Sequence, residues 1–299
     1  MTAMRAAVQR GGGRPIRAVR FALALAVALA GGAGPASATG PVFDMHVHLR
    51  DGEASLRSYR DAARAAGVEV TGLAAMRFGG PHQAREGDPA AIRADNDAII
   101  ALAAAHDDVV AVAVVHPHDG EPALQELERV AGLGVAVLKL HPHTQGFDAA
   151  DPRVATVVRR AGELGMVVVI DNANILPGDS ETLFNLAIRA PGTRFVFAHA
   201  GAMNFRFWNV LALARTAEAG FGDNIHFDIS ATVVLVADSP LEEEFVWMLR
   251  NVGIDRVMFG SDFPQFEVAR ANDALQRLDL TDAEKARIRE GNARRLFAR

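Results

Sequence analysis

The chain has 299 residues, of which 50% are apolar and 22% charged, and it contains no cysteine. This composition is typical of a folded globular protein and excludes disordered, collagen-like and disulfide-scaffold classes. The formal net charge of −5 argues against a nucleic-acid-binding surface, so we expect a small-molecule substrate and no nucleic acid.

The first segment has the layout of a secretory signal peptide. Five arginines precede the apolar run 21–30, which leads to the A-x-A sequence at 36–38. The run is shorter than the ~20 residues that a bilayer requires, so we expect cleavage after residue 38 and no stable membrane anchor. The chain that is left, 39–299, has 26 basic and 36 acidic residues, a net charge of −10. We expect it to be periplasmic or secreted.

From residue 41 onward, short β-branched apolar runs alternate with longer amphipathic stretches, which is typical of repeated βα units. The expected strands are 42–48, 70–78, 109–116, 135–141, 166–171, 194–199, 225–229 and 256–260. The expected helices are 53–66, 89–105, 121–131, 152–164, 180–189, 205–219, 241–251, 266–277 and 282–298. This α/β pattern predicts one (β/α)8 TIM barrel of the metal-dependent hydrolase type over residues 39–299.

Polar residues gather at the carboxyl ends of the expected strands, where (β/α)8 enzymes build their active sites. Asp44, His46 and His48 alternate along the first strand, so we expect them to share one face. The other members of this group end or follow later strands: His116, Lys139, His141, Asp171, His199 and Asp262. Imidazole and carboxylate are ligands that Zn²⁺ and related divalent ions prefer, so the group predicts a metal site.

These segments resemble the amidohydrolase superfamily of metal-dependent barrels, in the branch that includes aminocarboxymuconate semialdehyde decarboxylase and lactonase-like hydrolases. The matching sequences are FDMHVHL at 43–49, VLKLHP at 137–142, FVFAHAG at 195–201, FDIS at 227–230, RVMFGSDFP at 256–264 and EKARIREGNARRLF at 284–297. The resemblance implies that His46 and His48 are metal ligands and that His199 faces the reacting group. It also implies that Asp262 is both a ligand and a proton acceptor.

The chain departs from this branch at the fifth strand, where Asp171 stands in place of the usual histidine. As an oxygen ligand, Asp171 would favour Mn²⁺ or Mg²⁺ over Zn²⁺; the alternatives are a substrate contact and a weakened metal site. We expect one divalent ion, with Zn²⁺ first and Mn²⁺ or Mg²⁺ as alternatives. Lys139 is one of only two lysines and interrupts an apolar strand. We expect it to neutralise Asp171 or a substrate carboxylate, with a carboxylated bridge and a structural ion pair as alternatives.

Three further residues are candidate substrate contacts: His141, Arg77 and His116. Arg77 ends the second strand and can hold an anionic group, although an ion pair with a rim carboxylate is an equal alternative. For His116 a hydrogen bond within a loop is the alternative. The polar loop 79–89 is expected either at the rim of the barrel mouth or as a plain surface connection.

The leading hypothesis is an exported hydrolase with a metal held by His46, His48, Asp171 and Asp262. The metal activates a water molecule for attack on a small lactone, ester or amide, Asp262 accepts the proton, and His199 polarises the carbonyl or stabilises its oxyanion. The alternative is a non-oxidative decarboxylase of an unsaturated carboxylic acid on the same site. A second alternative is a non-catalytic binding barrel with an eroded metal site. A homo-oligomer is compatible with the sequence.

Overall fold

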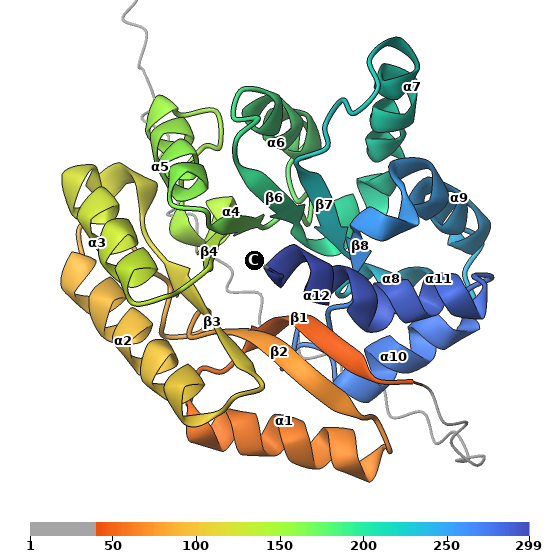
Figure 1. The fold of residues 1–299 in the computed structure, drawn as a ribbon, viewed down its shortest axis with the longest axis horizontal. Helices are drawn as coiled ribbons and strands as arrows, with labels where there is room; N and C mark the ends of the chain where they lie inside the picture. Colours follow the sequence, from red (N-terminus) through yellow and green to blue (C-terminus); the bar gives the residue numbers. More distant parts are fainter. Residues whose placement is uncertain (1–39, 299) are drawn as a thin grey trace, which may run out of the picture. The chain divides into compact units, whose positions relative to one another are not determined.

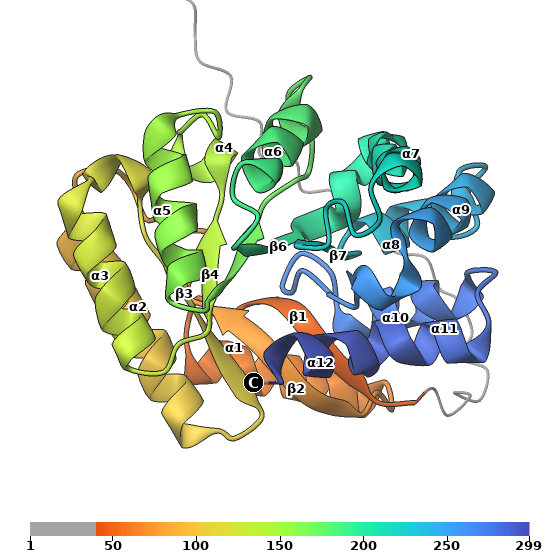
Figure 2. The ribbon, with the colours of Figure 1, turned by 45° about the horizontal axis from the view of Figure 1, so that its top comes forward.

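The computed structural model describes residues 40–298, so the predicted signal peptide at 1–38 lies outside the described residues. Eight parallel strands follow one another around a sheet in sequence order, with helices outside them (Figures 1 and 2). The strands are β1 (Val42–His48), β2 (Val70–Met76), β3 (Val109–Val114), β4 (Val137–Leu140), β5 (Val167–Ile170), β6 (Arg194–Phe197), β7 (Ile225–Asp228) and β8 (Val257–Met258). Hydrogen bonds of 2.9 Å from Met45 N to Phe259 O and from Asp262 N to His46 O join β1 to the segment around β8. The predicted (β/α)8 TIM barrel is confirmed.

Most of the helices follow the strands and pack around the outside of the sheet, whereas the last helix lies over the centre of the ring of strands (Figure 1). They are α1 (Glu53–Ala65), α2 (Pro89–Ala105), α3 (Glu121–Gly132), α4 (Pro142–Gln145), α5 (Pro152–Glu163), α6 (Asp179–Ile188), α7 (Val210–Ala217), α8 (Thr232–Val236), α9 (Glu242–Val252), α10 (Val268–Arg277), α11 (Asp282–Ala286) and α12 (Asn292–Phe297). Three segments are 3₁₀-helical: η1 (Pro117–Asp119), η2 (Ala198–Asn209) and η3 (Ile254–Arg256). One segment, η4 (Arg287–Gly291), is π-helical. Of the helices in the described part, none has the length and hydrophobicity to cross a bilayer.

The helix starts agree with the proline and cap pattern of the sequence. Asp88 accepts a hydrogen bond from the backbone N–H of Ala91 at the start of α2, and Asp151 accepts one from Arg153 at the start of α5. Proline occupies the first position of both helices, where its missing N–H has no intrahelical acceptor to lose. These caps fix the residues at which α2 and α5 begin.

Most expected strands run past the observed ones, because the polar residues at their carboxyl ends belong to the following loops. His141 and Asp171 each lie one residue beyond a strand, and His116 and His199 each lie two residues beyond one. A side chain in such a loop takes its direction from the local backbone and not from strand alternation. The positions of these residues at the barrel mouth are predictable from sequence, whereas their directions are not.

Two expected helices are interrupted. The expected helix 205–219 is α-helical only over α7, because its first residues belong to η2. The start of η2 contains left-handed residues, with φ of 63° at His199, 48° at Ala200 and 85° at Gly201. The expected helix 282–298 contains the π-helical segment η4, where the carbonyl of Ile288 accepts a hydrogen bond of 2.8 Å from Phe259 N. Both interruptions lie against strands that carry candidate site residues.

The prediction that three alternating residues of β1 share one face is wrong for Asp44. The pairing of β1 with β2 shifts register between Asp44 and Val47, and this irregularity breaks the alternation. Asp44 turns toward α1, where its Oδ2 accepts a hydrogen bond of 2.9 Å from Tyr59, the single tyrosine of the chain. Its Oδ1 accepts from the backbone N–H of Ser261 at 2.9 Å. Asp44 therefore ties β1 to the segment after β8.

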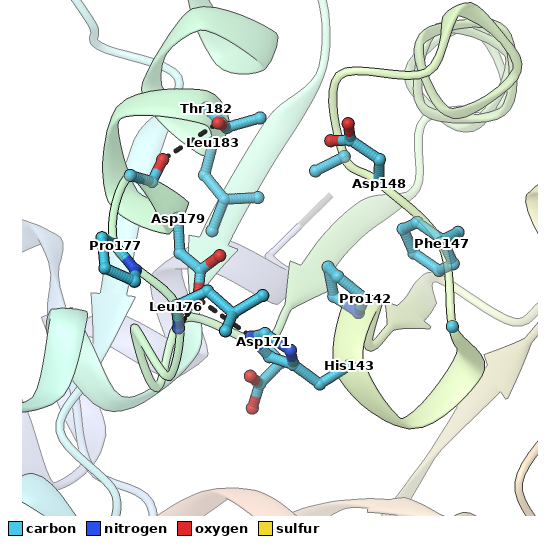
Figure 3. Close-up of a pocket in the computed structure, with 13 residues that line it drawn as sticks. Pro142, His143, Phe147, Asp148, Asp171, Leu176, Pro177, Asp179, Thr182 and Leu183 are labelled. Atoms are coloured by element: carbon cyan, nitrogen blue, oxygen red, sulfur yellow. Dashed lines mark hydrogen bonds and ion pairs between the residues drawn. The ribbon is translucent and has the colours of Figure 1, made fainter. Parts of the chain in front are cut away.

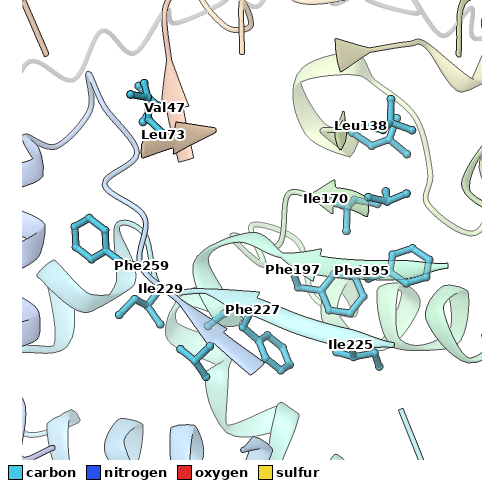
Figure 4. Close-up of a cluster of buried hydrophobic side chains, with 14 of the residues drawn as sticks. Val47, Leu73, Leu138, Ile170, Phe195, Phe197, Ile225, Phe227, Ile229 and Phe259 are labelled. Atoms are coloured by element: carbon cyan, nitrogen blue, oxygen red, sulfur yellow. The ribbon is translucent and has the colours of Figure 1, made fainter. Parts of the chain in front are cut away.

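Alternate residues of the strands divide between two buried clusters. Val167 and Val169 belong to the cluster inside the barrel, whereas Val168 and Ile170 belong to the layer between strands and helices. Figure 4 shows part of that outer layer, including Leu138, Ile170, Phe195, Phe197 and Phe227. Lys139 lies two residues after Val137, a member of the inner cluster, and this alternation places Lys139 inside the barrel.

Candidate metal and active site

Three metal-donor groups meet at the carboxyl end of the barrel. Asp262 Oδ1 lies 3.3 Å from His48 Nε2 and 3.7 Å from His46 Nε2. One donor atom from each residue lies within 4.8 Å of the other two, and all three residues are buried. Two imidazoles and a carboxylate suit a first-row divalent ion, so we refer to His46, His48 and Asp262 as the donor set.

The second ring nitrogen of each histidine in the donor set already has a partner. His46 Nδ1 lies 3.1 Å from Asp228 Oδ2, and His48 Nδ1 lies 2.9 Å from the carbonyl oxygen of Phe78. Both partners are acceptors, so each holds the ring proton on Nδ1 and leaves the Nε2 lone pair available. The residues present therefore fit a divalent cation bound through the two Nε2 atoms and Asp262.

The protonation states agree with this arrangement. Burial, followed by the nearby Lys139 ammonium, lowers the pKa of His46 to about 4, so its ring is neutral near pH 7. Burial acts against ionisation of Asp228, but the contacts with His46, His199 and Ser230 outweigh it and hold the pKa of Asp228 well below its ordinary value. An ionised Asp228 can only accept, which fixes the tautomer of His46.

Asp171 pairs with histidines and stands apart from the donor set. Its Oδ2 lies 3.1 Å from His199 Nε2 and 3.5 Å from His141 Nε2. Burial disfavours the charged form of His199, but the hydrogen bond to Asp171 and the surrounding carboxylates outweigh burial and raise the pKa of His199 to about 9. Burial likewise opposes ionisation of Asp171, yet the hydrogen bond from His199 and the positive charges around it hold the pKa of Asp171 well below its usual range. Near neutral pH the two residues form an imidazolium–carboxylate pair.

Lys139 lies next to the donor set. It is 1% exposed, and its Nζ is 3.4 Å from His46 Nε2. Burial lowers the pKa of Lys139, while the carboxylates of Asp171, Asp228 and Asp262 act in the opposite direction. Its position supports the predicted neutralising role, although the charge of Lys139 acts on three acids and not on Asp171 alone.

Unusual backbone conformations hold two of these residues. His199 and Asp262 have φ values of 63° and 66°, in the left-handed region that side chains other than glycine rarely adopt. Beside them, a Cβ on Gly260 would lie 3.0 Å from the Cβ atoms of both His46 and Ser230. Glycine at position 260 thus allows the close approach of the chain after β8 to β1.

The site opens into a cavity of about 410 Å³ at the barrel mouth, which is within the range of small-molecule sites. Apolar side chains on its wall include Phe78, Ile175 and Leu235. The loop 79–89 contributes to this wall, as expected for a rim segment. A second groove of about 550 Å³ shares Asp171 with the cavity. Figure 3 shows this groove between Phe147 on one side and Leu183 on the other.

The three candidate substrate contacts have different outcomes. His141 lines the cavity, and its contact with a substrate stays a prediction. Arg77 does not line it, and its Nε lies 3.1 Å from Asp95 Oδ1 in an ion pair. His116 is buried outside the cavity, where its Nε2 lies 3.0 Å from the carbonyl oxygen of Gln145. For Arg77 and His116 the structural alternatives describe the observed contacts.

Sequence reasoning missed two residues that support the donor set, Asp228 and Ser230. Asp228 Oδ1 accepts hydrogen bonds from the backbone N–H groups of Ser230 and His199 at 3.0 and 3.2 Å, and from the Ser230 hydroxyl. Ser230 Oγ also lies 3.1 Å from His46 Nδ1. The position of Asp228 at the end of an apolar strand is the same signal that identified Asp171 and was available in the sequence.

Comparisons with known proteins agree with the fold. A family model described as amidohydrolase matches residues 43–299. No curated protein sequence matches the chain.

Several solved structures share the fold. The 2,6-dihydroxybenzoate decarboxylase from Rhizobium is 16% identical, with a TM-score of 0.64 over 86% of this chain and 98% of that one. The 5-carboxyvanillate decarboxylase from Sphingomonas paucimobilis is 16% identical, with a TM-score of 0.63 over 86% and 98%. A dihydroxybenzoic acid decarboxylase from Polaromonas sp. JS666, with bound manganese and the inhibitor 2-nitroresorcinol, is 15% identical, with a TM-score of 0.61 over 86% and 96%. At these identities the likeness shows a common barrel.

Proposed function

The chain belongs to the amidohydrolase family, and from this membership and the site geometry we propose a metal-dependent decarboxylase of a small unsaturated carboxylic acid. The observation that carries the proposal is the imidazolium–carboxylate pair beside the donor set, with His199 Nε2 3.1 Å from Asp171 Oδ2. Decarboxylation replaces a carboxylate by a proton, so the site needs a proton donor next to the metal ligands. Decarboxylase names among the similar structures support the same reading.

A divalent ion at the donor set would act as a Lewis acid toward oxygen atoms of the substrate. The manganese bound in a similar structure favours Mn²⁺ over the Zn²⁺ first expected. We propose one such ion per chain.

The proton moves between stated atoms. When the carbon–carboxylate bond breaks, carbon dioxide leaves and the carbon keeps the electron pair, which takes one proton. The imidazolium of His199 holds that proton at Nε2, where Asp171 orients it, and both residues line the cavity. After release of the product, a proton from solvent restores the imidazolium.

The extra acid on the fifth strand does not prevent an anionic substrate from binding. The charge of Asp171 is balanced by His199 at 3.1 Å, and Lys139 adds a second positive charge close to His46. The objection to a decarboxylase, that Asp171 repels a carboxylate, loses its force once these partners are included.

Hydrolysis of a lactone, ester or amide is the second candidate, and one observation favours it. Burial opposes ionisation of Asp262, but the contact with His48 and the charges of His46 and His199 lower the pKa of Asp262. Asp262 is therefore an ionised proton acceptor at the donor set, which is what hydrolysis requires.

Isotope labelling separates the two reactions. The metal-loaded protein is incubated with a panel of hydroxybenzoic acids and a panel of lactones, esters and amides, in deuterium oxide and in ¹⁸O-water. A decarboxylase releases one carbon dioxide per turnover and leaves deuterium at the carbon that lost it. A hydrolase incorporates ¹⁸O into the product and releases no carbon dioxide. Loose metal binding with turnover of neither panel would favour the non-catalytic barrel.

Export and assembly remain proposals. We propose that the chain is exported and that cleavage after Ala38 leaves Thr39 at the new terminus, because the basic, apolar and A-x-A segments follow one another in that order. Amino-terminal sequencing of the protein recovered from outside the cytoplasm tests this, and an intact Met1 would contradict it. Light scattering of the mature protein tests whether it forms a homo-oligomer.

A further inference from the structure

The second groove adjoins the catalytic cavity on the side away from the donor set. Asp171 lines both spaces, and so do the loops after β4 and β5, whereas the donor set lines only the cavity. The residues of the two loops divide between the two spaces. Those on the cavity side are His141, Thr144, Ala173 and Ile175, and those on the groove side are Pro142, His143, Leu176 and Pro177. The groove is thus the outward continuation of the cavity between these loops.

The walls of the groove are apolar and joined to each other. Phe147 lies on one side and Leu183 of α6 on the other, and both side chains are buried (Figure 3). Leu176, which is 57% exposed, adds an apolar edge. His143 Nε2 lies 2.9 Å from Asp179 Oδ2, and this contact connects the loop after β4 to the start of α6. Asp179 Oδ2 also accepts a hydrogen bond of 2.9 Å from the backbone N–H of Leu176, so the apolar edge is held in place.

The charges on these walls oppose an anionic ligand. Within residues 40–298, three acids line the groove, Asp148, Asp171 and Asp179, and no lysine or arginine does. The imidazole of His143 is already engaged by Asp179. A carboxylate in the groove would lose its hydration without a basic side chain to replace it, whereas an uncharged apolar group would gain from contact with Phe147 and Leu183.

We infer that this groove binds an uncharged aromatic ring of the substrate, separate from the end of the molecule that reacts at the donor set. The volume of the groove, about 550 Å³, is ample for a ring, since an apolar cavity of about 150 Å³ already binds benzene. The inference rests on the proposed function for the acid at the reacting end. It makes the substrate an unsaturated or aromatic acid that carries an uncharged second ring.

Ligands that differ by one ring test this inference through binding alone. Isothermal titration of the manganese-loaded protein compares salicylate with 4-phenylsalicylate and 5-phenylsalicylate, which keep the same acid end. We expect at least one phenyl derivative to bind about 10- to 100-fold more tightly than salicylate, because its second ring leaves water for the groove. A carboxylate at the far end of that ring should remove the gain, because three acids line the groove.

A substitution at the edge of the groove locates the second ring. Leu176→Asp places a charge beside the groove, so it should remove most of the gain and leave the binding of salicylate itself unchanged. Leu213→Asp is the matched control, since Leu213 is 72% exposed on α7 and lines neither space, and it should keep the full gain. If Leu176→Asp does not fold, Leu176→Ser removes the apolar edge without adding a charge and should reduce the gain in the same direction.

Four results would overturn the inference: wild-type protein that binds none of these ligands, no gain from a second ring, a gain that survives the added carboxylate, or an equal gain in Leu176→Asp. Failure of the groove and failure of the proposed function give different results. Release of carbon dioxide from hydroxybenzoic acids without any gain from a second ring would refute the groove site and leave decarboxylation in place. A gain that depends on Leu176, without any release of carbon dioxide, would refute decarboxylation and leave the groove site in place.

Discussion

Asp228→Asn tests how the donor set is prepared for a metal. In the wild-type protein, Asp228 Oδ2 accepts the proton on His46 Nδ1 at 3.1 Å. Asp228 Oδ1 accepts from the backbone N–H groups of His199 and Ser230 and from the Ser230 hydroxyl. An amide in place of the carboxylate has one oxygen and one NH₂ group, so its orientation decides the outcome.

The hydrogen-bond count decides that orientation. If the NH₂ group took the Oδ1 position, the two backbone N–H groups and the Ser230 hydroxyl would point at another hydrogen-bond donor. Each lost hydrogen bond would cost about 1 kcal/mol of stability. With the NH₂ group at the Oδ2 position only the bond from His46 is affected, and the histidine can restore it by changing tautomer. The NH₂ group then donates to Nδ1, and the ring proton moves to Nε2, the atom that faces the metal position.

A protonated Nε2 cannot bind a metal, so we expect Asp228→Asn to lower metal affinity about 10- to 100-fold, or roughly 1.4 to 2.7 kcal/mol. Competition with a chromophoric chelator measures the affinity for Mn²⁺ and Zn²⁺. Asp95→Asn is the matched control, because Asp95 is a largely buried acid paired with Arg77 away from the donor set. Wild-type affinity in Asp228→Asn, with the fold intact by circular dichroism, would refute the role given to Asp228.

Three more substitutions have defined outcomes. Gly260→Ala places a Cβ 3.0 Å from that of His46, so it should cost about 1–3 kcal/mol of stability and weaken metal binding; an unchanged urea midpoint and metal affinity would contradict the close approach. Burial, followed by a nearby arginine, lowers the pKa of His226 to about 4, so the wild-type protein should lose stability as the pH falls from about 6.5 toward 4. His226→Asn keeps a donor at the Nδ1 position and does not titrate, so its unfolding midpoint should fall less over that range; parallel curves for the two proteins would be the contrary result. Asp171→Asn should lower the pKa of His199, measured by NMR, and reduce turnover at least tenfold with metal content unchanged; loss of metal would instead make Asp171 a ligand.

The barrel and the donor set were predictable from local features of the sequence. Alternating apolar and amphipathic segments identify the strands and helices, and a carboxyl strand end identifies the side on which His46, His48 and Asp262 lie. All the parallel strands end at one rim, so sequence position alone brings these residues together. The three form one group in the structure, as expected.

The partners of individual side chains were not predictable in the same way. A register shift within β1 turns Asp44 toward Tyr59, although strict alternation places it with His46. Arg77, a candidate substrate contact, instead pairs with Asp95, an acid that follows it by 18 residues on a helix. Such outcomes depend on backbone irregularities and on distant partners, neither of which a local pattern contains.

The central claim is that one divalent ion binds to the donor set while Asp171 stays with His199. A crystal structure of the manganese-loaded protein, with anomalous data, tests it directly. We expect a single anomalous peak within bonding distance of His46 Nε2, His48 Nε2 and the Asp262 carboxylate, and Asp171 still hydrogen-bonded to His199. No peak at these atoms, or a peak bound by Asp171 with His199 released, would contradict the claim.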